Sequence, residues 1–262
     1  MPHVAERKVA TIERQWPAAA IQRLEVGEVD GSVSVEAGAT DRITLVARVR
    51  SRGVEAKPNA ENQGFFESAV AGTTLVVGRK EKSRKSFWTR GDDVTIDYEL
   101  HVPPQVALDL RTVNGRIVTR GIEGRTEAVT VNGPLDLESS GNQELSANAV
   151  NGSIRAKFLT SFQGARFKTV NGGVEAILPQ SASFSVDLSQ VNGDFEATFP
   201  LSIHSNPGSR RVSGEINGGK HELRIVTVNG DVEVLHLPVA PVAPVAPAAP
   251  VAAPAPPAPP TT

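Results

Sequence analysis

The chain contains no cysteine, and it has only one methionine, one tyrosine and two tryptophans in 262 residues. The lack of cysteine excludes disulfides, thiolate metal sites and cysteine nucleophiles, and it fits an exported protein as well as a cytosolic one. The net charge is only −2, from 27 basic and 29 acidic residues, so no global field favours nucleic acid or a membrane surface. We therefore expect no nucleic-acid partner.

Long apolar runs are also missing. No run reaches the roughly 18 apolar residues of a membrane helix, and residues 1–8 lack the apolar centre of a signal peptide. Glycine and proline are abundant instead, with 23 and 19 copies, and 39% of the residues are hydrophobic. This balance favours many short strands and turns around a core, so the sequence predicts an all-β protein.

A repeat dominates the middle of the chain. Six Val-Asn-Gly triplets occur, with their asparagines at Asn114, Asn132, Asn151, Asn171, Asn192 and Asn229. The first five are separated by 18, 19, 20 and 21 residues, and taking Val212-Ser213-Gly214 as a degenerate copy divides the longer gap before the last. Val29-Asp30-Gly31 reads as an earlier relative, and the interval to Asn114 has room for about four further coils. Strands are also expected at Ile43–Val49, Thr73–Val77 and Val94–Val102.

The Asn-Gly pair adopts positive φ at low cost, so each triplet marks a turn between two strands. In a hairpin meander the constant valine would face mostly polar partners. In a stack of coils, a valine turned inward at the corner would meet an apolar neighbour in the next coil, which favours stacking with parallel pairing. Equivalent asparagines could then hydrogen-bond from coil to coil as a ladder, or asparagine could be selected only for left-handed φ.

Two further rows follow from this register. Threonines stand two residues before their asparagines, at Thr112, Thr130, Thr169 and Thr227. The predicted core lining comprises Leu110, Ile117, Leu135, Leu137, Leu145, Ile154, Phe167, Val174, Leu188, Phe195, Ile225 and Val232.

The repeat, together with the run from Val94 to Pro104 that leads into Leu108–Gly115, resembles a bacterial family of domains of unknown function known as putative adhesins. The resemblance implies a single-stranded parallel β-helix, or β-solenoid, with coils of about 18–21 residues, in exported or membrane-associated proteins without established catalysis. We expect a lead-in segment at residues 1–20, the solenoid at residues 21–237 and a disordered Pro/Ala-rich tail at residues 238–262. A cell-envelope or extracellular location is implied, and a cytoplasmic one stays open because no signal peptide is visible.

The search for chemistry gives few candidates. The five histidines show no metal-ligand spacing, and no nucleophile elbow or phosphate-binding glycine loop occurs, so neither a metal nor a cofactor is expected. Six carboxylates are predicted to point outward, and we interpret them as the solvated side of strands because no cluster of them repeats on adjacent coils. They are Asp109, Asp136, Glu138, Glu175, Asp187 and Glu196.

One segment stands out in charge, since residues 79–90 carry six basic residues, one acidic residue and two adjacent aromatics. Such a segment could bind an anionic glycan or an envelope surface, or it could be a solvated insertion whose aromatics pack back on the column. The candidate anion-binding residues are Arg79, Lys80, Lys82, Arg84, Lys85, Trp88 and Arg90.

The sequence therefore predicts a non-enzymatic, adhesin-like binding or scaffold module. The first alternative is a structural protein that self-associates end to end through exposed strand edges. The second is a carbohydrate-active β-helix enzyme, which would need two outward carboxylates about 5–9 Å apart in a groove.

Overall fold

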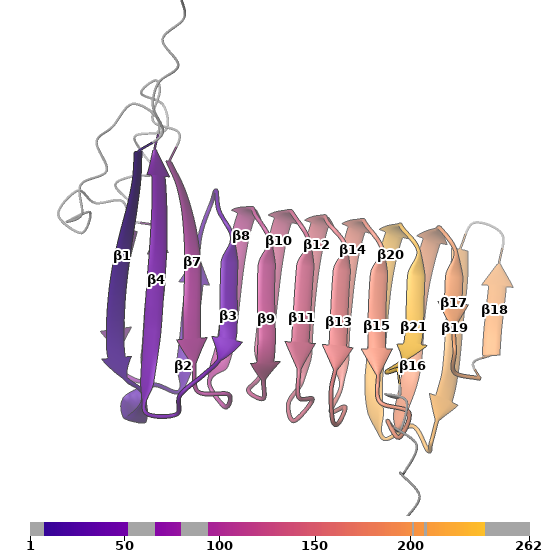
Figure 1. The fold of residues 1–262 in the computed structure, drawn as a ribbon. Coiled ribbons are helices and arrows are strands. Elements are labelled where there is room, and N and C mark those ends of the chain that lie inside the picture. The colour runs from indigo at the N-terminus through magenta and orange to yellow at the C-terminus, as the bar shows by residue number, and fades with distance from the viewer. Residues whose placement is uncertain (1–7, 52–65, 80–93, 201, 207–208, 239–262) are drawn as a thin grey trace, which may run out of the picture.

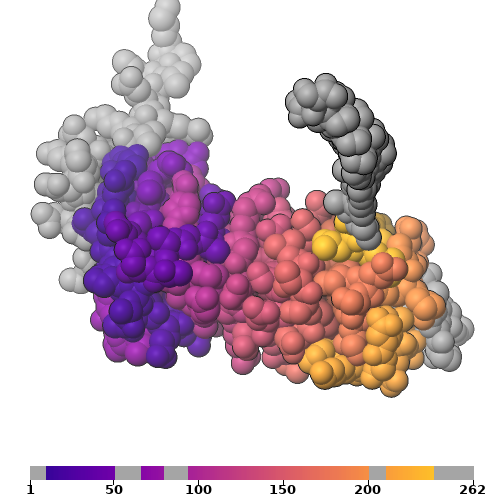
Figure 2. All heavy atoms as spheres, turned by 60° about the horizontal axis from the view of Figure 1, so that its bottom comes forward, coloured from indigo at the N-terminus to yellow at the C-terminus, as the bar shows by residue number. Residues whose placement is uncertain are grey.

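The structure is a computed structural model that describes residues 8–51, 66–79, 94–200, 202–206 and 209–238. Within these residues, strands form two sheets that face each other in an elongated stack (Figures 1 and 2). The all-β prediction is confirmed. One short 3-10 helix, η1 (Ala18–Ala20), follows the first strand. The expected tail lies outside the described residues from residue 239 onward.

In the described residues the first sheet has ten strands. In spatial order they are β1 (Lys8–Pro17), β4 (Arg42–Ser51), β7 (Val94–Val102), β3 (Val33–Ala37), β9 (Ile117–Ile122), β11 (Leu135–Ser139), β13 (Ile154–Phe158), β15 (Val174–Leu178), β21 (Val232–His236) and β17 (Phe195–Ala197).

The second sheet has eleven strands over the same described ranges. In spatial order they are β18 (Ser202–Asn206), β19 (Ser209–Ile216), β16 (Phe184–Asn192), β20 (His221–Asn229), β14 (Ala165–Asn171), β12 (Leu145–Asn151), β10 (Thr126–Asn132), β8 (Ala107–Asn114), β2 (Arg23–Gly27), β6 (Thr74–Arg79) and β5 (Phe66–Ala71).

Each Asn-Gly turn joins a strand of the second sheet to a strand of the first, and we call such a pair a coil. Neighbouring coils pair in parallel, so that β10 pairs with β8 and β12 while β11 pairs with β9 and β13. The residues between the sheets form one apolar core. All of the predicted lining residues are buried except Phe195, which is partly buried against the core.

The order of the coils differs from the order of the chain. The last coil, β20–β21, lies between β14–β15 and β16–β17, as its yellow strands show in Figure 1. The interpretation of Val212-Ser213-Gly214 as a turn is wrong, because these residues lie in β19, which pairs antiparallel with β16. The chain makes β18 and β19 at the end of the stack and then returns to insert its last coil one place inward.

The prediction of about four coils between Asp30 and Asn114 is also wrong. The β2–β3 coil is the direct neighbour of β8–β9, with Asp30 bridged to Asn114. Strands β4, β5, β6 and β7 extend the two sheets beyond this coil instead. β4 and β7 contain two of the three strands expected from the sequence, and β6 covers the third, expected at Thr73–Val77, from Thr74 onward. The predicted lead-in is, from residue 8 onward, the edge strand β1 followed by η1.

The turn glycines are required by close backbone approach. A Cβ on Gly115 would lie 1.8 Å from the carbonyl oxygen of Gly31, and one on Gly152 would lie 1.9 Å from that of Gly133. The expectation of left-handed asparagines is wrong, because Asn217 is the only described non-glycine residue with positive φ. The buried Thr169 hydroxyl also donates to the Gly152 carbonyl, at 3.0 Å, and so closes the gap between these coils.

Candidate functional site

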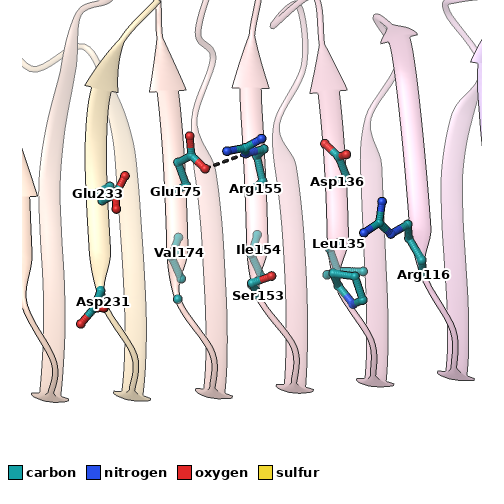
Figure 3. Close-up of a pocket in the computed structure, with 12 residues that line it drawn as sticks. Arg116, Leu135, Asp136, Ser153, Ile154, Arg155, Val174, Glu175, Asp231 and Glu233 are labelled. Carbon is teal, nitrogen blue, oxygen red and sulfur yellow. Dashed lines mark hydrogen bonds and ion pairs between the residues drawn. The ribbon is translucent and has the colours of Figure 1, made fainter.

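An open groove of about 380 Å³ lies on the outer face of the first sheet, beside the Asn-Gly turns. It crosses neighbouring coils at the positions just after each turn (Figure 3). In the middle of the stack these positions hold only Ser153 and Gly173, while Arg116 and Asp231 stand further out on either side. Small side chains between larger ones therefore make the hollow.

A row of charged side chains runs along the groove, one on each coil. The strand register places Asp136 beside Arg155, Arg155 beside Glu175, and Glu175 beside Glu233. Figure 3 shows these four side chains on adjacent strands. Arg155 Nε donates to Glu175 Oε2 at 2.6 Å, and this hydrogen bond raises the pKa of Arg155. The groove therefore presents fixed charges of both signs.

The row of carboxylates continues from coil to coil at the acidic end of the groove. Outward carboxylates were not expected to cluster on adjacent coils, but the inserted last coil places Glu233 between Glu175 and Glu196. Asp231 and Asp194 are neighbours for the same reason, and the Asp194 amide donates to Asp231 Oδ1 at 2.8 Å. The prediction that no carboxylates cluster on adjacent coils is therefore wrong, because Glu175, Glu233 and Glu196 occupy the same register position on three successive strands.

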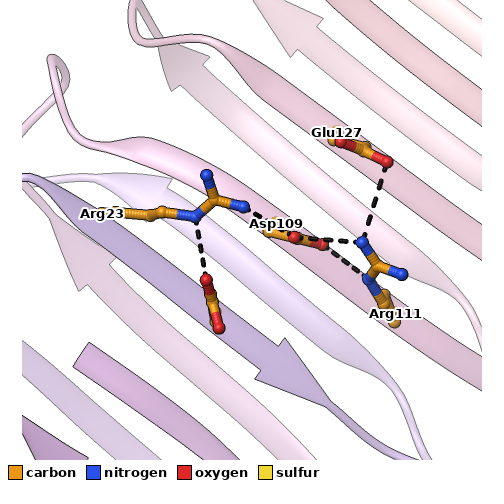
Figure 4. Close-up of polar contacts among 5 residues, drawn as sticks. Arg23, Asp109, Arg111 and Glu127 are labelled. Carbon is orange, nitrogen blue, oxygen red and sulfur yellow. Dashed lines mark hydrogen bonds and ion pairs between the residues drawn. The ribbon is translucent and has the colours of Figure 1, made fainter. Parts of the chain in front are cut away.

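The outer face of the second sheet carries a separate ion-pair network (Figure 4). Asp109 accepts hydrogen bonds from Arg23 Nη2 and Arg111 Nε, both at 2.8 Å, and Arg111 also approaches Glu127 at 3.8 Å. Partial burial raises the pKa of Asp109, but hydrogen bonds and charge from Arg111 and Arg23 outweigh it, so the net pKa is lowered. This network joins β2, β8 and β10 and acts as a structural clamp.

The turn asparagines are joined in series by side-chain hydrogen bonds of 2.8–2.9 Å, each from one Nδ2 to the next Oδ1. The order along the stack is Asp30, Asn114, Asn132, Asn151, Asn171, Asn229 and Asn192. The ladder therefore does not follow the order of the chain, in which Asn192 would come directly after Asn171. Each such bond satisfies amide groups at an exposed edge.

The valines of the triplets do not turn inward as the sequence analysis expected. The residue two positions before each asparagine, a threonine in four of the six triplets, is buried, and successive strand residues face opposite sides, so the valine that follows it points to solvent. Val150, for example, remains 42% exposed. The coils do stack in parallel, but the stacking does not depend on valines that pack inward.

The basic segment contributes one described residue to the predicted anion site. Arg79 is buried, with 3% of its side chain exposed, and its Nε lies 3.1 Å from Glu28 Oε1. Burial raises the pKa of Glu28, while the charge of Arg79 and hydrogen bonds oppose that effect. Arg79 therefore faces the core and not an external anion. The other six candidates, at positions 80–90, lie outside the described residues.

The described residues contain no group of three or more histidines and carboxylates arranged to hold a metal ion. In the same residues no helix is long and apolar enough to cross a membrane.

Comparison with solved structures gives distant similarity across most of the chain. A "putative cell adhesion protein" from Clostridium sporogenes is 6% identical, with 88% of this chain and 99% of that chain covered at a TM-score of 0.46. A "putative adhesin" from Bacteroides fragilis is 11% identical, covering 87% and 97% at a TM-score of 0.34. A "putative lipid binding protein" from Parabacteroides distasonis is 12% identical, covering 86% and 96% at a TM-score of 0.35.

No curated protein matches the chain. A family model described as Toastrack DUF4097 matches residues 17–235, which is most of the described structure. The chain therefore belongs to the Toastrack DUF4097 family.

Proposed function

We propose that the chain is a non-enzymatic, adhesin-like binding module of the bacterial cell envelope, and that it binds its ligand in the groove of the first sheet. The observation that carries this proposal is the row of fixed charges beside the hollow at Ser153 and Gly173. The row rests on strands whose backbone is held from both sides, so little conformational entropy is lost when a ligand binds.

The chemistry of the groove suits a hydroxyl-rich ligand such as a glycan. Carboxylates accept hydrogen bonds and a guanidinium donates several in a planar fork, so together they match neighbouring hydroxyl groups of a sugar. Arg155 and Glu175 are already oriented by their ion pair, and the Glu233 carboxylate stands on the next strand. The regular coil spacing would align several sugar units along the stack.

The test is a glycan array followed by affinity measurements on two matched variants. Arg155 is 60% exposed and pairs with Glu175 at 2.6 Å, while Arg166 is 59% exposed and pairs with Glu144 at 2.8 Å on the other sheet. We expect Arg155→Gln to weaken binding at least about tenfold, in line with losing a charged hydrogen bond, and Arg166→Gln to leave it unchanged. Equal effects of the two variants, or no glycan bound by the wild type, would contradict the proposal.

The envelope location is supported by the resemblance of the repeat to bacterial adhesins. Fractionation of native cells tests it directly. We expect the protein with the envelope or the medium, and its recovery with the cytosol alone would overturn this part of the proposal.

A second candidate function is glycoside cleavage, which one observation favours. Glu175 and Glu233 lie on paired strands, about 4.8 Å apart in backbone spacing, close to the separation of about 5 Å used by retaining glycosidases. Glu175 is occupied by Arg155, however, which leaves one carboxylate of the pair engaged. Release of reducing sugar by the wild type that disappears in Glu233→Gln would establish this function and refute the non-enzymatic one.

A further inference from the structure

The exposed valines form a continuous apolar strip on the edge of the stack, which we call the valine ridge. In stack order it consists of Val29, Val113, Val131, Val150, Val170, Val228 and Val191. Five of these are 37–48% exposed, and the other two are of intermediate exposure. Val70 on β5 is the sole exposed large hydrophobic residue outside the ridge among the described residues.

The ridge is straight because the turns that carry it are aligned, as the row of turns after β8, β10, β12 and β14 shows along the upper edge of Figure 1. Neighbouring coils are hydrogen-bonded, so the valines recur about every 4.8 Å and span about 29 Å. A partner that packs along this length needs apolar groups with the same repeat. A second copy of this chain supplies that repeat without any adjustment.

The charges beside the ridge indicate how two copies would meet. We number the coils in stack order, starting from the coil of Val29. On the first-sheet side, the positions after the turn glycines hold Arg116 in the second coil, uncharged residues in the third to fifth coils, and Asp231 in the sixth coil. A two-fold axis through the central coil, at Val150, exchanges the second coil with the sixth. Arg116 of each copy then faces Asp231 of the other.

The opposite, parallel arrangement would be unfavourable. It would bring the first-sheet side of one copy against the second-sheet side of the other at equal coil positions. Arg116 would then face Arg111, which stands two residues before the ridge on the same coil, and like charges repel. Charge complementarity therefore selects the antiparallel pairing.

We propose that the valine ridge is a docking surface for a second copy of the chain, and that two copies associate edge to edge and antiparallel about a two-fold axis. A self-complementary patch of this kind is what a two-fold dimer requires. The strip is only one residue wide and is smaller than a standard interface, so the dimer dissociates in the micromolar range. This association is lateral, unlike the end-to-end joining predicted from exposed strand edges.

The first test is sedimentation equilibrium of the full chain over a range of concentrations. Val150 lies at the two-fold centre and is 42% exposed, and Val70 is a control of similar exposure, at 46%, on the edge strand β5 of the same sheet. We expect Val150→Lys to weaken dimerisation at least tenfold and Val70→Lys to leave it unchanged. A wild type that is monomeric at every concentration, or equal effects of the two variants, would overturn the proposal.

The second test exchanges the charges. We expect Arg116→Asp and Asp231→Arg each to weaken the dimer several-fold, and the double variant to regain most of the wild-type affinity, since the pair is restored with reversed sign. Failure of the double variant to recover would refute the antiparallel geometry.

The same variants separate other occupants of the ridge. Loss of binding to phosphatidylcholine vesicles in Val150→Lys, with no dimer in the wild type, would assign the ridge to a lipid surface. A full chain that stays monomeric until residues 239–262 are removed would assign it to that segment. Either result overturns the proposal.

Discussion

Gly152→Ala tests how closely the coils approach one another. The added Cβ would lie 1.9 Å from the carbonyl oxygen of Gly133 and 2.7 Å from its carbonyl carbon. Both atoms belong to the backbone, so the two coils must separate by about 1.5 Å at this turn to restore an ordinary contact of 3.4 Å. The separation strains the backbone hydrogen bond from Gly133 N to Asn151 O, which is 3.1 Å long, and the neighbouring side-chain hydrogen bond between Asn151 and Asn132.

The cost follows from these contacts. Overpacking costs about 1–3 kcal/mol, and each weakened hydrogen bond contributes about 1 kcal/mol, so we expect a loss of about 2–4 kcal/mol. For a domain of this size that corresponds to a fall in Tm of roughly 5–15 °C, measured by calorimetry or circular dichroism. Gly31→Ala should cost at least as much, because its Cβ would lie 1.9 Å from the carbonyl oxygen of Ile96 and its φ of +149° is strained for alanine.

The matched control is Gly27→Ala, since a Cβ on Gly27 meets no atom within 4 Å and its φ lies outside the left-handed region. We expect this variant to stay within about 1 kcal/mol of the wild type. If Gly152→Ala melted together with Gly27→Ala, close approach would not be the reason for the turn glycines.

The remaining predictions concern the ladder, acid stability, the tail and the basic segment. Asn151→Ala removes two ladder bonds of 2.9 Å at an exposed edge and should cost about 1 kcal/mol in denaturant titration, and no loss would make the ladder energetically neutral. The pKa of Asp109 is lower in the folded protein than its usual value of 3.8, so ionised Asp109 stabilises the fold at pH values above 3.8. This contribution disappears as the pH falls through the lower folded pKa. Asp109→Asn should therefore be less stable than the wild type at pH 7 and should approach the stability of the wild type in strong acid. Removal of residues 238–262 should shift Tm by less than a few degrees, because alternating proline and alanine offer no apolar face, and a larger fall would mean that they dock. Reversal of Arg84 and Lys85 to Glu should abolish salt-sensitive binding to anionic vesicles or glycans without changing Tm, and absence of such binding in the wild type would remove the segment as a site.

The spacing of the Val-Asn-Gly triplets and the types of residue around them were enough to predict the core and the parallel stack of coils. Leu135, Ile154 and Val174 occupy equivalent positions after their turns and are at most 1% exposed, as alternation requires. The same alternation places the triplet valines outside, because the residue before each of them, a threonine in four of the six triplets, is buried. The expectation that they turn inward came from treating a constant apolar residue as a buried one.

The order of the coils could not be predicted from the sequence. Each Val-Asn-Gly turn presents the same backbone groups to its neighbours, so the repeat alone does not say which copy follows Asn171. The neighbouring strand gives a physical reason for the observed order. β19 pairs antiparallel with β16 along one edge, so β20 can pair only with the opposite edge of β16, which is the edge that faces β14.

At both ends the parallel stack gives way to antiparallel strands, which the repeat also does not encode. β1 pairs with β4, β5 with β6 and β18 with β19, so three of the four sheet edges end in an antiparallel strand. β17, at the remaining edge, has only three residues. The short β17 discourages further strand pairing at its edge, whereas β1, with ten residues in unbroken register on β4, leaves a long edge at the other end of the stack.

The insertion of the last coil decides which acidic residue faces Arg116 across the valine ridge. In chain order β17 would follow β15, and Glu196 would be the neighbour of Glu175, whereas in the observed order Glu233 separates them. The two exchanged coils carry the same acidic pair, Asp231 and Glu233 in one and Asp194 and Glu196 in the other, so the acidic end of the groove has the same charge in either order. Because the last coil is inserted one place inward, Asp231 and not Asp194 stands in the sixth coil, which the proposed two-fold axis sets opposite Arg116.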